Sequence, residues 1–112
     1  MSSGNVFADL TPTTPEETFA QLFGAENVRI ERIVSHGQAS PAGFWYDQDH
    51  AEWVMVLSGS AGLRIEGEAT ERNLAPGDYL LLDAYVRHRV EWTDSTQPTV
   101  WLAVHVGRAA KP

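Results

Sequence analysis

The chain has 112 residues, 43% of them hydrophobic and 21% charged, which is the composition of a single globular domain with one core. Its formal net charge of -7 at pH 7, with eight Lys and Arg residues scattered along the chain, argues against a nucleic acid or an anionic membrane as a partner. The absence of cysteine excludes disulfide bonds, thiolate nucleophiles and zinc-thiolate sites, and it agrees with a cytoplasmic protein. No basic segment precedes an apolar run and no apolar stretch reaches membrane-spanning length, so neither an export signal nor an anchor is expected.

The first part of the chain is expected to contain an irregular arm and a short helix. Residues 1–13 are mostly small, polar and proline-containing, which predicts the arm. Residues 14–24 begin with Thr14 as a helix N-cap, followed by a proline and two acidic residues, and Gly24 ends the segment. The apolar side chains of this predicted helix share one side at helical spacing: Phe19, Leu22 and Phe23. We therefore expect the helix to cover an apolar surface.

From Val28 onward the apolar residues recur with a period of two, which is typical of strands. The predicted strands cover residues 28–35, 44–48, 52–57, 63–66, 69–73, 79–82, 88–92 and 100–106. Turn sequences rich in Gly, Pro and Asp separate them. The pattern predicts one all-β domain over residues 27–108, built as an antiparallel sandwich or barrel.

The strand predicted at residues 52–57 is apolar on both faces. Val54 and Val56 share one parity, and Trp53, Met55 and Leu57 share the other. A patch of that size is seldom left exposed. A homodimer is the expected cover, and the predicted N-terminal helix is the weaker alternative.

Chemistry is concentrated in one stretch, Phe44–Gly59, with the sequence FWYDQDHAEWVMVLSG. Tyr46, Gln48, His50 and Glu52 share one parity, so in an extended chain all four point to the same face of a sheet. This arrangement suits a polar pocket inside a β-barrel.

Residues in this stretch and beyond it resemble the two short motifs of the cupin family. The first motif ends with a glutamate, six residues and a glycine, as in Glu52 and Gly59. The second contains a glycine and a later histidine, as in Gly77 and His88, and begins at a Pro-Gly-Asp turn. The resemblance covers about residues 29–105. It implies a small single-domain cupin, a cupin-2-like antiparallel β-barrel that is also called a jelly roll or double-stranded β-helix.

The chain departs from the family's metal-binding pattern at two ligand positions. Counting back from Glu52 places Tyr46 and Gln48 where the family has histidines. In the second motif Asp83 and Tyr85 replace a proline and a glycine. The family implies a divalent transition metal such as iron, manganese, nickel or zinc, but a neutral amide and a protonated phenol are weak ligands. The candidate metal ligands are Gln48, Glu52 and His88, with His50 a less favoured one.

Further residues are candidates for the pocket wall. Five aromatic residues are expected to surround it, and His105 is a further candidate: Trp45, Tyr46, Tyr85, Trp92 and Trp101. The alternative is that the tryptophans fill the core, that His105 is a hydrogen-bonded core histidine and that His50 lies in a solvated loop. Glu52 has a second explanation as an ion-pair partner of Arg87 or Arg89. The sequence leaves His36 unassigned.

Two functions remain open for this pocket. The first is an enzyme that acts on a small polar metabolite, with Glu52, His88 and Tyr46 as candidate catalytic residues, either through a metal or by direct acid and base chemistry. The second is a non-catalytic module that binds or senses a small molecule such as a sugar, without metal. A structural protein with an empty pocket is a lesser third option.

Overall fold

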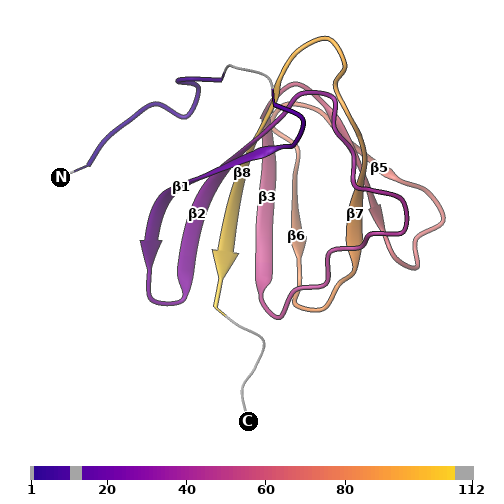
Figure 1. The fold of residues 1–112 in the computed structure, drawn as a ribbon. Helices are drawn as coiled ribbons and strands as arrows, with labels where there is room; N and C mark the ends of the chain where they lie inside the picture. The colour runs from indigo at the N-terminus through magenta and orange to yellow at the C-terminus, as the bar shows by residue number, and fades with distance from the viewer. Residues whose placement is uncertain (1, 11–13, 108–112) are drawn as a thin grey trace.

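The computed structural model describes residues 2–10 and 14–107, and in that part of the chain it contains strands and no helix (Figure 1). The strands are β1 (Thr18–Ala25), β2 (Val28–Ser35), β3 (Ala51–Ser58), β4 (Ala61–Ile65), β5 (Arg72–Leu74), β6 (Tyr79–Leu82), β7 (His88–Thr93) and β8 (Thr99–Val106). All the strand pairs are antiparallel. The prediction of an all-β, antiparallel cupin-type fold is confirmed.

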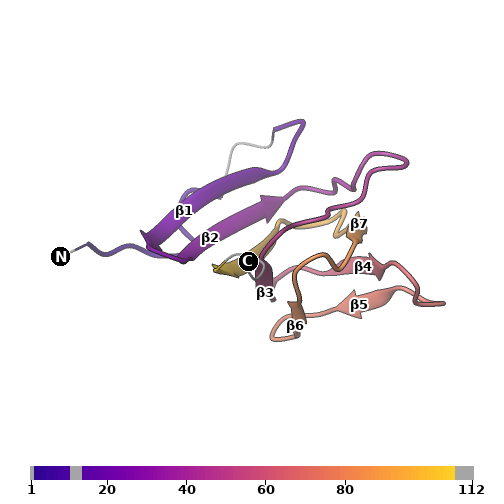
Figure 2. The ribbon, with the colours of Figure 1, turned by 90° about the horizontal axis from the view of Figure 1, so that it is seen from below.

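Two sheets form the two layers of the protein. The larger has the order β1-β2-β8-β3-β6 and the smaller the order β5-β4-β7. Seen from below, the sheets lie on opposite sides of the molecule and converge near β3 and β6 (Figure 2). Apolar side chains from both sheets meet between the layers and form the core: Val54, Val56, Ala61, Leu63, Leu74, Leu82, Val90, Trp101 and Ala103.

The helix predicted over residues 14–24 is wrong, because Thr18–Ala25 forms strand β1 at the edge of the larger sheet. A β-bulge between Gln21 and Phe23 adds one residue to β1 and so breaks the period-two alternation. The apolar residues of β1 therefore fall at a three- to four-residue spacing that resembles a helix. Pairing along the whole of β2 outweighs the local helix signals. Residues 2–10 of the predicted arm contain a turn and no strand, and residues 11–13 lie outside the described part.

The strand predicted at residues 44–48 is also not formed. This segment makes a single isolated bridge, between Tyr46 and His88. The backbone N–H of Tyr46 donates to the carbonyl of His88 at 2.7 Å, and the N–H of His88 donates back at 3.1 Å. The segment is thus a loop that crosses the start of β7 and touches the ladder at one point.

The outward face of the larger sheet is mostly apolar, with Arg32 beside Leu102 as a charged exception. We call the following side chains the outer face: Ile30, Trp53, Met55, Tyr79, Leu81, Leu102, Val104 and Val106. Register places them side by side, since Trp53 pairs with Leu81 on one side and with Val104 on the other. Leu81 is 59% exposed. Because β1 extends the sheet instead of folding over it, no helix covers this face within the described residues. None of those residues forms a helix that is long and apolar enough to cross a membrane.

Candidate functional site

A cavity of about 140 Å³ lies between the sheets, which is the volume of about five water molecules in the liquid. It is lined by apolar core residues such as Val54, Leu63 and Trp101. Its polar lining comes from β2, β3, β7, β8, the segment before β1 and the loop before β3: Glu17, Arg29, Glu31, Tyr46, Gln48, Glu52, His88 and His105.

Glu52 and His88 face each other across this cavity. The His88 Nε2 atom lies 3.9 Å from Glu52 Oε1, and both residues are buried. The other ring nitrogen, Nδ1, lies 3.0 Å from the Val86 carbonyl oxygen, which can only accept a hydrogen bond. Nδ1 therefore carries a proton, and a neutral His88 directs a free Nε2 lone pair into the cavity. Gln48 donates its side-chain N–H to Glu52 Oε1 at 2.9 Å, which fixes the carboxylate.

Tyr46 lies against the His88 ring. The ring centroids are 5.2 Å apart and the planes are inclined by 18°, so the two rings stack. Burial, followed by the negative charges of nearby glutamates, raises the pKa of the Tyr46 phenol above its usual value. The phenol keeps its proton and can donate it to a ligand oxygen.

Arg89 holds the loop that carries Tyr46 and Gln48. Its guanidinium donates to the carbonyls of Pro41 and Phe44 at 3.0 Å each and to that of Ser40 at 3.1 Å. A planar guanidinium with five donors suits such a cluster of backbone acceptors. Arg89 therefore holds the loop together with the Tyr46–His88 bridge and with backbone hydrogen bonds from Ser40 to Val90 at 2.9 Å and from Tyr85 to Gln48 at 2.7 Å.

Three of the predicted pocket residues lie outside this cavity. Trp45 is not part of the cavity lining, and its ring centroid lies 5.6 Å from the guanidinium carbon of Arg87. Trp92 lies on the smaller sheet and donates its indole N–H to Glu71 at 3.1 Å. Tyr85 is 63% exposed in a turn with a φ of 67°. The structure brings Tyr46, Gln48, Glu52, His88 and His105 together.

His50 directly precedes β3 and lies next to His105 of β8. Its Nε2 atom lies 2.8 Å from Nδ1 of His105, whose own Nε2 lies 2.9 Å from Glu31. His50 lines a second hollow, on the outside at the end of the barrel, together with Asp49 and His105. His36 is elsewhere, with its Nε2 atom 3.1 Å from the Leu10 carbonyl oxygen.

The sequence interpretation missed three charged residues of the cavity wall: Glu17, Arg29 and Glu31. A signal was present in β2, where Arg29 and Glu31 share the parity of Ile33 while the other parity is mainly apolar. This is the reverse of a strand with a polar outside and an apolar inside, and it indicates a polar interior. Glu17 gave no such signal because it was assigned to the helix.

The cavity wall carries more negative than positive charge. Three carboxylates face it, from Glu17, Glu31 and Glu52, and Arg29 lies 3.8 Å from Glu31. Glu17 accepts a hydrogen bond from the Ser35 hydroxyl, which in turn accepts one from the Trp101 indole at 3.0 Å. Burial raises the pKa of Glu17 more than this hydrogen bond lowers it. A neutral or positively charged ligand suits such a wall better than an anion.

The donor set fits a metal ion poorly. Gln48 turns its N–H toward Glu52, Tyr46 keeps its proton, and His105 is engaged by Glu31 and His50. Among residues 2–10 and 14–107, no group of three or more His, Asp or Glu side chains is arranged to hold an ion. Glu52 and His88 alone leave too few ligands for the sites that such ions occupy.

Comparisons with known proteins identify the family. A family model for the cupin domain matches residues 32–105. A solved structure from Ralstonia eutropha JMP134, described as a "putative mannose-6-phosphate isomerase", is 53% identical, with a TM-score of 0.93 over 96% of this chain and 99% of that one. A cupin superfamily protein from Desulfitobacterium hafniense DCB-2 is 15% identical, with a TM-score of 0.72 over 95% of this chain and 92% of that one, and shows the fold alone. No curated protein matches. The chain therefore belongs to the cupin family.

Proposed function

We propose that this small cupin binds a small, uncharged, hydroxylated metabolite in its cavity and moves a proton on it without a metal. The observation that carries the proposal is the buried Glu52–His88 pair, 3.9 Å apart, with the Tyr46 phenol stacked on the histidine. A carboxylate, an imidazole nitrogen and a phenol thus meet in one partly apolar space. These are the groups that general acid and base catalysis needs.

The arrangement suits proton abstraction next to a carbonyl group. Glu52 would take the proton from carbon, and Tyr46 would donate a hydrogen bond to the carbonyl oxygen as negative charge develops there. His88 Nε2 would accept the proton of a neighbouring hydroxyl group. Glu52 would return its proton to the adjacent carbon, and His88 Nε2 would give the hydroxyl proton to the former carbonyl oxygen, which completes an isomerisation with no gain or loss of atoms.

The Ralstonia eutropha structure supports a sugar-like ligand, because its description names a sugar phosphate isomerase. The charge of the cavity wall supports the unphosphorylated form. A phosphate dianion would meet three carboxylates, and Arg29 is the one Lys or Arg side chain in the described lining. We therefore expect an aldose, a ketose or a similar polyol to bind better than its phosphate ester.

A binding module without turnover is the second candidate. The observation in its favour is that Gln48 already donates to Glu52, so both side chains are placed to bind a ligand hydroxyl group. In that case the cavity senses or carries the same class of metabolite. A cytoplasmic location suits either function.

One experiment separates these candidates. The purified protein, without a histidine tag, is incubated in D2O with aldoses, ketoses and their phosphate esters, and NMR follows both binding and deuterium entry next to the carbonyl. Binding with exchange that Glu52→Gln lowers at least a hundredfold supports the enzyme, while binding without exchange supports the module. Glu66→Gln, which removes an exposed partner of Arg87, is the matched control.

Two outcomes would overturn the proposal. Preferential binding of phosphate esters would contradict the charge argument. The second outcome is stoichiometric iron, manganese, nickel or zinc in elemental analysis that is lost in both Glu52→Ala and His88→Ala. It would mean that the protein uses a bound metal, as is usual in the family.

A further inference from the structure

Phe19 of β1 places an exposed aromatic ring at the mouth of the cavity. It lines the cavity, yet 55% of the residue is exposed to solvent. Phe19 pairs with Ile33, and Ile33 pairs with Trp101. Paired residues of neighbouring strands point to the same face of a sheet, and all three of these line the cavity. The Phe19 ring therefore lies on the inner face of the larger sheet, near its edge.

The smaller sheet does not cover this part of the inner face. Strands β1 and β2 form one edge of the larger sheet, and β6 forms the other. Seen from below, β1 and β2 extend away from β4 and β5 (Figure 2). The cavity is thus open to solvent on the side of β1. A ligand that needs more space than about 140 Å³ would extend outward across Phe19.

A second phenylalanine of the same strand provides a contrast. Phe23 is 53% exposed, which is nearly the same as Phe19. It pairs with Ile30, whose other partner is Val104, so it points to the side of the outer face. The two phenylalanines thus differ in the face that they occupy rather than in their exposure, and Phe19 is the one that lines the cavity.

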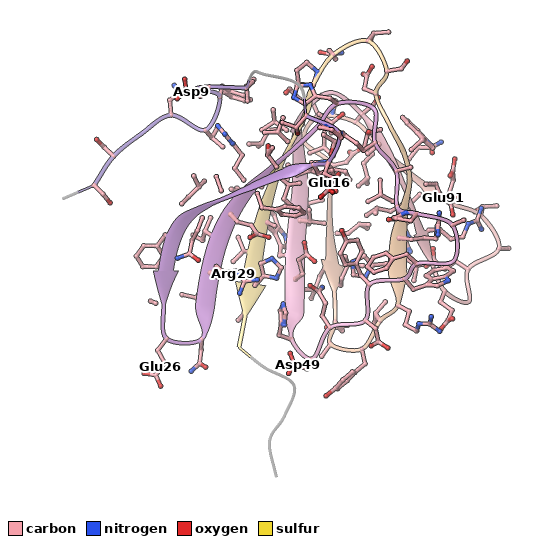
Figure 3. The ribbon with its side chains drawn as sticks, in the orientation of Figure 1. Asp9, Glu16, Glu26, Arg29, Asp49 and Glu91 are labelled. Atoms are coloured by element: carbon pink, nitrogen blue, oxygen red, sulfur yellow. The ribbon has the colours of Figure 1, made fainter. Side chains whose placement is uncertain are left out.

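Charged side chains of the cavity lining lie on both sides of Phe19 along the mouth. Glu17 precedes Phe19 by two residues, and Arg29 lies in β2 opposite Gly24, close to the turn between β1 and β2. Figure 3 shows Arg29 near that turn and Glu16, the neighbour of Glu17, toward the other end of the two strands. Phe19 is therefore an apolar surface between two groups that can bind hydroxyl groups.

The Glu17 carboxyl group is held in position from behind. Its Oε2 atom accepts a hydrogen bond from the Ser35 hydroxyl, which accepts one from the Trp101 indole at 3.0 Å, and both Ser35 and Trp101 are buried. No group in the described part of the chain donates to Glu17 Oε1. After burial, the charge of Glu17 is the largest cause of the raised pKa of Tyr46, so Glu17 also lies close to that phenol. One fixed carboxyl oxygen is thus available to a ligand.

This arrangement matches the two kinds of surface on a pyranose sugar. Hydroxyl groups project from the rim of the ring, while the hydrogens bound to carbon make a face of the ring apolar. The face of an aromatic side chain is negative and attracts such C–H groups, and a carboxylate accepts hydrogen bonds from hydroxyl groups. An open-chain polyol offers no such flat apolar face.

We propose that Phe19 stacks against the C–H face of a sugar ring at the mouth of the cavity, while Glu17 accepts a hydrogen bond from a hydroxyl group on the rim of that ring. This inference rests on the proposed function for the class of ligand, an uncharged sugar. It adds the form of the sugar that binds and two residues that select it. Aldoses exchange between ring and open-chain forms in water, so binding of the ring is compatible with a later proton transfer at Glu52 and His88 on the open chain.

The test compares methyl pyranosides, whose ring cannot open, with alditols, which have no ring. Neither class has a carbonyl group, so NMR titration of the full chain measures binding without any reaction. Wild-type protein should bind a methyl pyranoside more tightly than the alditol of the same configuration. The C–H signals of the bound pyranoside should move upfield, because they lie over the face of an aromatic ring.

Variants of Phe19 identify the ring that causes this shift. Phe19→Leu retains an apolar side chain without an aromatic face, so it should weaken methyl pyranoside binding about tenfold and abolish the upfield shift. Its affinity for the alditol should change by less than about twofold. Phe19→Trp restores an aromatic face and should retain both the binding and the shift, which separates stacking from a structural role.

Two further variants complete the experiment. Phe23→Leu is the matched control, since it makes the same substitution at a similar exposure on the other face, and it should leave binding and shift unchanged. Glu17→Gln should weaken methyl pyranoside binding about fivefold, because a neutral amide oxygen is a weaker acceptor than a carboxylate.

The inference and the proposed function can fail separately. Equal affinity of Phe19→Leu and wild type for methyl pyranosides, or an equal loss in Phe23→Leu, would overturn the inference, and deuterium entry into aldoses would then still support the enzyme. Loss of the upfield shift in Phe19→Leu alone, with no deuterium entry, would support the inference and leave a binding module. Wild-type protein that binds neither class of ligand would contradict both.

Discussion

Replacement of Arg89 by glutamine should open the loop that carries Tyr46 and Gln48 while leaving the barrel folded. Arg89 gives this loop three hydrogen bonds to backbone carbonyls, and backbone hydrogen bonds join the loop to the smaller sheet at Tyr46 with His88 and at Ser40 with Val90. The paired strands do not depend on these bonds. We therefore expect a local effect rather than a loss of the fold.

The magnitude follows from the bonds that are lost. A hydrogen bond to a charged group contributes about 1.5–3 kcal/mol when buried, and less where water competes. Two of the three Arg89 contacts to the loop lie at the surface, and glutamine can retain one of the three. The loss is therefore about 2 kcal/mol in the free energy of loop opening. That corresponds to a roughly 30-fold rise in the open population.

Amide hydrogen exchange measures this opening directly. The Tyr46 amide, which donates to His88 at 2.7 Å, should exchange about 30-fold faster in Arg89→Gln. Amides of the β3–β8 ladder should change much less. Arg72→Gln removes an exposed arginine that pairs with Glu68 and serves as the matched control. Affinity for the cavity ligand should fall by no more than the same factor.

Two results would refute this reasoning. An unchanged exchange rate at Tyr46 would mean that the loop does not depend on Arg89. Equal acceleration at Tyr46 and along the β3–β8 ladder would mean that the loop and the barrel open as one unit.

Three other predictions concern stability and assembly. Burial raises the pKa of Glu17, so the folded state holds this proton more tightly than the unfolded state and stability falls as pH rises from about 4.5 through the raised value. Glu17→Gln should accordingly be more stable than wild type at neutral pH and equal to it below pH 4.5, as measured by urea unfolding. Gly59 has a φ of 80°, and an added Cβ would lie 2.6 Å from Thr99 Cα, so Gly59→Ala should lower the free energy of unfolding by about 3 kcal/mol. Gly43 has a similar φ of 78° but open space around it, so Gly43→Ala should lower the free energy of unfolding by about 1 kcal/mol. Light scattering should give twice 12.4 kDa for a homodimer formed through the outer face, and Leu81→Lys should give a monomer; a monomeric wild type would contradict this.

Most of the barrel could be predicted from the sequence because its strands alternate regularly. Val28–Ser35 and Tyr79–Leu82 have the predicted bounds, and the other core strands differ by a few residues at their ends. The β1 strand could not be predicted because a bulge interrupts the period-two alternation of its apolar residues. The loop at residues 44–48 alternates like a strand, yet it makes one isolated bridge, and Arg89 of β7 binds its backbone by contacts that the sequence does not reveal.

The site could be predicted where residues at alternating positions in the sequence also lie on the same face of the sheet. Glu52, Gln48 and Tyr46 lie on the cavity as their spacing predicted, and His88 joins them from β7. The prediction that Trp45 and Tyr85 line the pocket is wrong, because a loop can turn residues that are neighbours in the sequence in opposite directions. The contact of His50 with His105 spans 55 residues and depends on the register of β3 against β8, which no local pattern contains.

The single bridge between Tyr46 and His88 also bears on how this fold can change its ligand. Residues 44–48 supply two of the polar groups of the cavity, while their only ladder contact is that bridge. Substitutions or insertions there would alter the side chains that meet a ligand without shifting the register of any strand pair. The loop at residues 44–48 can therefore vary while the paired strands of the barrel stay the same, so relatives with the same barrel can recognise different metabolites.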